Sequence, residues 1–193
     1  MPSARIDIFS KQAAFENSPF SVLTMQKLTP QSPLHHPEGN VWNHTLLVVD
    51  RAAALKTFSA NPRAFMWAAL LHDIGKPNTT KKRRGRITAY DHDRIGAELA
   101  HVLLRQVTDE TDFIDIIVSL VRYHMQPLYV VKGLTFKDIV GMKEHTDVIE
   151  IALLSYCDRL GRGFVDSRAE AQAIFTFLET CNERTDFEWL KQV

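Results

Sequence analysis

An all-α helical bundle is the fold that the sequence predicts, and three observations support it. Apolar residues recur along the chain at a spacing near 3.6, which is the period of an amphipathic helix. Hydrophobic residues make up 45% of the chain and charged residues 24%, a globular composition that excludes disordered, collagenous and coiled-coil proteins. The length of 193 residues is typical of one domain, and no internal repeat or linker divides it.

Helix bounds follow from prolines, glycines and capping residues. Residues 32–40 form a loop rich in proline and glycine, and Pro62 marks the first turn of a helix. Gly75 is expected to stop that helix, and the polar residues 76–91 predict a small hairpin around Gly85. The expected helices are about 41–58, 62–73, 93–106, 109–124, 135–143, 146–160 and 166–181.

Charge and cysteine content restrict the class of protein further. The chain has 23 Lys and Arg against 23 Asp and Glu, so it lacks the overall basic field of a nucleic-acid-binding domain. No apolar run reaches the ~18 residues of a membrane span, and Met1–Ser10 lacks the apolar core of a secretory signal. Cys157 and Cys181 lack metal-type spacing and are expected to be reduced thiols. We therefore expect a cytoplasmic protein.

Histidines and an aspartate fall on the apolar faces of four expected helices. A buried carboxylate without a partner is costly, whereas imidazoles and carboxylates that converge in a helical core suit a divalent transition metal. Each residue alone could be an ordinary hydrogen-bonded core residue, but the adjacent pair His72-Asp73 at a helix end favours a metal site. The four residues are His44, His72, His124 and Asp158. His44 shares its face with Leu47, Val48 and Leu55, and His72 follows Phe65, Ala68 and Ala69. His124 closes the stripe of Phe113, Ile116, Ile117, Leu120 and Val121, and Asp158 shares a face with Ile151, Leu154 and Ser155.

The order His44, His72-Asp73, Asp158 resembles that of the HD superfamily of metal-dependent phosphohydrolases. The chain is similar in particular to the HD domain attached to bacterial tRNA nucleotidyltransferases. The segments that carry this resemblance are His36-Pro-Glu38, Leu70-Leu-His-Asp-Ile-Gly-Lys76, Asp91-His92, Gly96-Ala97, Tyr123-His124 and Asp158-Arg-Leu-Gly-Arg162. The Gly-Ser loop and Asp-x-Asp strand of the nucleotidyltransferase catalytic domain are missing, so CCA addition is not implied.

The resemblance covers about residues 35–165. It implies a single HD-type helical domain over 1–193, with the metal site in its core. Residues 1–34 would form a helical extension, broken by prolines, and residues 166–193 would form C-terminal helices.

The resemblance also implies a metal site with one or two divalent transition ions, of Fe, Mn, Ni, Co or Zn. One ion is expected on His44, His72, Asp73 and Asp158. In dinuclear members two further histidines complete a second site with the shared Asp73, and His92 and His124 are the candidates here. His92 precedes its expected helix, so a surface-loop histidine is the alternative. His36 could orient a ligand from behind.

Basic residues near these motifs are candidates for phosphate binding. Lys76 is expected to act with Asp73 in catalysis, although a cation at a helix end can also complement the helix dipole. Three arginines could contact substrate or form salt bridges. The run Lys81–Arg86 is either a solvated loop or a basic flap that binds a polyphosphate or an RNA backbone. The three arginines are Arg122, Arg159 and Arg162.

We therefore predict a metal-dependent phosphohydrolase of the phosphodiesterase, phosphatase or nucleotidase type. Its substrate would be a nucleotide, a cyclic phosphodiester or an RNA-terminal phosphate, attacked by water that the metal activates. A dinuclear-iron oxygenase is one alternative, and a non-catalytic nucleotide- or RNA-binding module is another. The expected partner is a phosphate-bearing small molecule or an RNA end, with no membrane partner.

Overall fold

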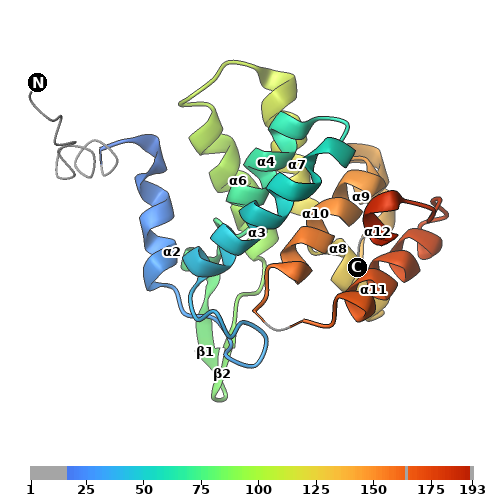
Figure 1. The fold of residues 1–193 in the computed structure, drawn as a ribbon. Helices are drawn as coiled ribbons and strands as arrows, with labels where there is room; N and C mark the ends of the chain where they lie inside the picture. Colours follow the sequence, from blue (N-terminus) through green and yellow to red (C-terminus); the bar gives the residue numbers. More distant parts are fainter. Residues whose placement is uncertain (1–16, 164, 192–193) are drawn as a thin grey trace, which may run out of the picture.

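A computed structural model describes residues 17–163 and 165–191 of the chain, and it confirms the predicted all-α class (Figure 1). The first part of the expected N-terminal extension, residues 1–16, lies outside the described residues. Within the described ranges, no helix has the length and apolar character needed to cross a membrane. The elements are η1 (Pro19–Thr24), α2 (Met25–Leu28), α3 (Val41–Leu55), η2 (Lys56–Phe58), α4 (Pro62–Leu71), α5 (Lys76–Thr79), β1 (Lys81–Arg83), β2 (Arg86–Thr88), α6 (His92–Leu104), α7 (Thr111–Tyr123), α8 (Gln126–Val131), α9 (Ile139–His145), α10 (Val148–Leu160), α11 (Ser167–Thr180) and α12 (Glu188–Lys191).

The core lies where α3, α4, α7 and α10 pack against one another. Small side chains on α4, among them Ala64, Ala68 and Ala69, are fully buried and let neighbouring helices approach closely. On α10, every residue from Ile151 to Arg159 is buried, as its central place in Figure 1 suggests. Polar side chains that these helices carry must therefore find their partners inside the bundle.

A tight turn over residues 72–75 joins α4 to α5. A Cβ at Gly75 would lie 2.1 Å from the carbonyl oxygen of His92 and 2.6 Å from the nitrogen of Gly96, so the contact requires glycine. Gly75 has φ −80°, which is not the left-handed geometry of the expected helix stop. Its role is instead to let the turn pack against the first residues of α6.

The loop between α2 and α3 is closed at its base. Pro30 and Asn40 form an isolated antiparallel bridge, Gln31 N–H donates to the carbonyl of Gly39 at 3.0 Å, and Val41 N–H donates to that of Thr29 at 3.0 Å. Residues 31–39 therefore form a loop with a fixed base at the N-terminus of α3.

The hairpin expected around Gly85 is present as β1 and β2, which project from the helical body in Figure 1. Arg84 and Gly85 have φ of +48° and +77°, as in a two-residue type I′ turn. Arg83 pairs with Arg86 next to this turn.

Some expectations differ from the structure. The helix α8 is absent from the predicted elements, because Pro127 suggests a stop, whereas it occupies the first turn of α8, where proline is favourable. His92 is the first residue of α6 and is buried, so it is not a surface-loop histidine. Leu47 and Ile116 are each 39% exposed and lie at the edges of their apolar stripes rather than in the core.

Candidate metal centre

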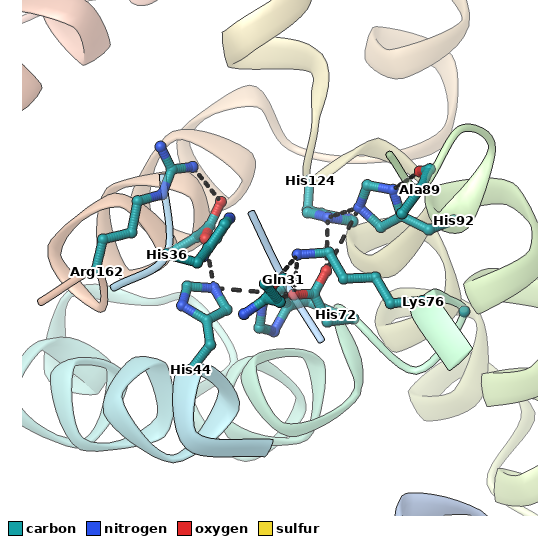
Figure 2. Close-up of polar contacts among 12 residues, drawn as sticks. Gln31, His36, His44, His72, Lys76, Ala89, His92, His124 and Arg162 are labelled. Carbon is teal, nitrogen blue, oxygen red and sulfur yellow. Dashed lines mark hydrogen bonds and ion pairs between the residues drawn. The ribbon is translucent and has the colours of Figure 1, made fainter. Parts of the chain in front are cut away.

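The structure brings all six predicted metal ligands together in the core (Figure 2). All six are buried. They form two adjacent groups, and within each group the potential ligand atoms lie within 4.8 Å of one another. The α3–α10 group consists of His44, His72 and Asp158, and the α6–α7 group of Asp73, His92 and His124.

In the α6–α7 group, backbone carbonyls fix the tautomers of both histidines. His92 Nδ1 donates to the carbonyl of Ala89 and His124 Nδ1 to that of Val121, both at 2.7 Å. Their Nε2 atoms lie only 3.3 Å apart. Burial lowers the pKa of both rings, that of His124 to about 4, so neither Nε2 carries a proton near neutral pH. Two lone pairs thus face each other, an arrangement that a cation between them would stabilise.

The α3–α10 group also contains a free imidazole lone pair. His72 Nδ1 donates to the carbonyl of Ala69 at 2.8 Å, which leaves its buried Nε2 with no hydrogen-bond partner among the described residues. His44 Nε2 lies 2.9 Å from Asp158 Oδ1. An unpartnered buried nitrogen beside a carboxylate is costly unless a ligand satisfies it.

Asp73 lies between the two groups with one oxygen towards each. Its Oδ1 is 3.4 Å from His92 Nε2, and its Oδ2 is 3.3 Å from His72 Nε2. Burial alone would raise its pKa, but the imidazole of His72 and the ammonium of Lys76 hold that pKa well below the usual range. Asp73 is therefore an ionised carboxylate that lies between the two groups.

The donor set fits a divalent transition ion. It combines imidazole nitrogens, which suit Fe, Ni, Co and Zn, with carboxylate oxygens, which also suit Mn. Asp158 is ionised like Asp73, because Arg162 and His44 outweigh the effect of burial on its pKa. Because three imidazoles have oriented lone pairs and both aspartates are ionised, the two groups could hold one ion or two.

Sequence reasoning missed Glu38, which supports His44 from the 31–39 loop. Its Oε1 lies 2.8 Å from His36 Nδ1 and 2.9 Å from His44 Nδ1, the latter an ion-pair distance with poor hydrogen-bond alignment. Burial raises the pKa of Glu38, but the contacts with both histidines outweigh it and lower the pKa to about 2. His36 thus contacts Glu38, with its ring centroid 4.7 Å from that of His44, and Glu38 is the residue that reaches His44 Nδ1. The motif His36-Pro-Glu38 contains the signal, since it places a carboxylate close to the first ligand in sequence.

Gln31 was also missed, and it positions Lys76. The Lys76 ammonium lies 2.6 Å from Gln31 Oε1 and 2.7 Å from Asp73 Oδ2 (Figure 2). Because Gln31 comes from the fixed base of the 31–39 loop, this loop supports both His44 and Lys76.

The predicted arginines have different surroundings. Arg122 pairs with Asp93 at 3.0 Å and Arg162 with Asp158 at 3.5 Å. Both line a cavity of about 940 Å³ that reaches the candidate ligands Asp73, His92 and Asp158. Arg159 is buried against Glu170 of α11 at 2.5 Å and does not line this cavity.

Comparison with known proteins identifies relatives of this chain. It is 32% identical over 152 residues to the Multifunctional CCA protein of Aromatoleum aromaticum, a match that covers 75% of this chain and 35% of that protein. It is 38% identical over 95 residues to the Multifunctional CCA protein of Actinobacillus pleuropneumoniae serotype 5b, with 49% and 23% covered. The chain thus matches about a quarter to a third of the length of these relatives.

A family model, the HD domain, matches residues 41–163. This range contains all six candidate ligands and ends just after Arg162. The predicted resemblance is thereby confirmed at the level of the family, and the chain belongs to the HD domain family.

Proposed function

We propose that the protein is a metal-dependent phosphohydrolase that acts on a nucleotide, a cyclic phosphodiester or an RNA-terminal phosphate. The observation that carries this proposal is the position of Asp73, with one oxygen towards each of two groups of oriented imidazoles. The similarity to Multifunctional CCA proteins supports a nucleotide or RNA as the substrate.

The proposed ligands divide between two sites. His44, His72 and Asp158 would hold one divalent ion, His92 and His124 a second, and Asp73 would be shared. A bound ion lowers the pKa of water and neutralises charge on phosphoryl oxygens. The carbonyls of Ala69, Ala89 and Val121 keep three imidazoles in the tautomer that metal binding needs.

Cationic side chains favour a phosphate ester over the substrate of an oxygenase. Lys76, Arg83, Arg122 and Arg162 line the same cavity as Asp73. The Lys76 ammonium is held between Asp73 and Gln31, where it can offset negative charge on a phosphoryl group beside the ligands. Arg162 and Arg122 keep their carboxylate partners and orient the outer oxygens of the ester.

Metal content and hydrolysis measured on the same samples test this proposal. The purified protein should contain divalent transition metal and hydrolyse bis(p-nitrophenyl) phosphate and 2′,3′-cyclic nucleotides. His72→Ala should lose both properties, because it removes the oriented Nε2 lone pair. His101→Ala, a matched change at an exposed histidine of α6, should keep both.

Two outcomes would contradict the proposal. Full metal content and turnover in His72→Ala would place the site elsewhere. Metal-dependent oxygen consumption without hydrolysis of any of these esters would identify an oxygenase instead.

A further inference from the structure

The cavity at the candidate metal centre is much larger than a phosphate group needs. Its volume of about 940 Å³ lies at the upper end of the range for cavities that enclose whole small molecules. Beyond Asp73, His92 and Asp158, its walls include the β1–β2 hairpin, residues 30–36, the first turn of α6, and α8 with the loop that follows. These walls would face the part of a substrate that lies beyond the reacting phosphate.

The hairpin wall concentrates positive charge. We call its five cations the basic hairpin, and all five are exposed. None of them forms an ion pair with a carboxylate within residues 17–163 and 165–191. Of the five, Arg83 lines the cavity, and the other four lie on the hairpin outside the cavity lining. The Arg83 guanidinium carbon lies 4.8 Å from the ring centroid of Tyr90, which is also exposed. The basic hairpin consists of Lys81, Lys82, Arg83, Arg84 and Arg86.

The α8 wall is aromatic and apolar. Tyr129 and Phe136 both line the cavity, with ring centroids 5.7 Å apart, and Phe136 is 59% exposed. Leu128 and Leu134 line the cavity beside them. We call Tyr129 and Phe136 the aromatic shelf. The exposed ring of Phe136, with the half-buried ring of Tyr129 beside it, offers a stacking surface that a phosphate chain alone would not use.

We propose that this cavity binds the end of a single-stranded nucleic acid. The terminal base stacks on the aromatic shelf, and the phosphates further along the strand contact the basic hairpin. The combination of a positive surface that follows a backbone with aromatic rings that accept bases is typical of single-strand binding. The inference rests on the proposed function in one respect, because the metal centre is what positions the terminal phosphate.

The two walls together distinguish this ligand from simpler ones. A mononucleotide would use the aromatic shelf but has too few phosphates for five exposed cations. An inorganic polyphosphate would use the basic hairpin but leave the aromatic shelf without a partner. Only a ligand that carries both flat bases and a run of phosphates matches both walls.

Fluorescence anisotropy tests the proposal through binding rather than turnover. The probes are labelled RNA and DNA strands of about ten nucleotides, with a non-hydrolysable phosphonate at the 3′ or the 5′ end. Each strand should bind to the purified protein at least about tenfold more tightly than the matching mononucleotide phosphonate. The strand that binds most tightly shows whether the ligand is RNA or DNA and which of its ends is bound.

Two variants test the two walls separately. Lys82→Gln/Arg83→Gln/Arg84→Gln should reduce the slope of log Kd against log salt by about two, since each phosphate contact on a single strand contributes about 0.7. Arg51→Gln/Lys56→Gln/Arg105→Gln, with the same charge change at exposed positions elsewhere, should keep the slope. Phe136→Ala should weaken strand binding about tenfold without changing the slope, whereas Phe58→Ala should have no effect.

Three results would overturn the inference. In the first, strands bind no more tightly than mononucleotides. In the second, both triple variants change the salt slope equally. In the third, a polyphosphate binds as tightly as a strand, and Phe136→Ala leaves strand binding unchanged. A failure of the proposed function would look different, because hydrolysis of cyclic nucleotides would be absent while strand binding persisted.

Discussion

The two ligand groups differ in what surrounds one imidazole, that of His44. In the α6–α7 group, His92 and His124 are oriented by backbone carbonyls three residues earlier, and those carbonyls belong to the same helix or to the segment entering it. In the α3–α10 group, the carbonyl of Ala69 orients His72 in the same way. His44 is instead flanked by two carboxylates, Asp158 on α10 and Glu38 on the 31–39 loop.

This difference shows in which group a substitution can adjust metal affinity. A backbone carbonyl cannot be substituted, so the geometry of the α6–α7 group depends on the helix ends alone. A carboxylate from a loop can be replaced without altering a helix, so the affinity of the α3–α10 group is adjustable. Asp73 serves both groups, His124 serves one, and Glu38 only supports a ligand of the other, so substitutions at these three positions separate the groups.

The largest effect is expected from Asp73→Asn, because this residue serves both groups. The variant should bind no stoichiometric metal, against about two equivalents in the wild type, and should lose hydrolysis. Asp50→Asn, at an exposed position of α3, should match the wild type. Metal analysis combined with circular dichroism makes the test, and a folded Asp73→Asn protein with two tightly bound ions would refute a shared ligand.

His124→Ala should have an intermediate effect, because it removes one Nε2 from the α6–α7 group and leaves the α3–α10 group complete. Isothermal titration with a divalent transition metal should show about one equivalent instead of about two. A wild-type protein that never binds more than one ion would show that the α6–α7 group holds no separate metal.

Glu38→Gln should have the smallest effect, confined to the α3–α10 group. Loss of such a partner typically weakens metal affinity by about 10–100-fold without changing the number of ions bound. In a His124→Ala background the single remaining equivalent should weaken by the same factor. The exposed Glu144→Gln is the control. An unchanged affinity in Glu38→Gln would mean that Asp158 alone orients His44.

Periodicity predicts which side chains are buried because it reports the direction of a side chain from its helix. For this reason the sequence alone assigns His44, His124 and Asp158 to the interior, and the structure buries all three. Periodicity carries no such information in a loop, so it does not identify Gln31 and Glu38 as supports. The contact of Gln31 with Lys76 also joins residues 45 positions apart.

Other differences have equally local causes. Pro127 can end one helix or begin the next, and its sequence neighbours do not decide between them. Arg159 lies beside Asp158 in sequence, but consecutive side chains on a helix diverge, and its partner Glu170 belongs to α11.

The base of the 31–39 loop determines which length changes the protein can accept. Gln31 and Gly39 are hydrogen-bonded across the base, while Leu34 at the tip is 83% exposed. A residue inserted next to Leu34 would lengthen the tip at little entropic cost and leave both anchored ends in place. A deletion between Thr29 and Gln31 would instead shift the bridge by one residue. That shift would displace the partner of Lys76 and the partner of His44 together, so a single lost codon there would act as two substitutions.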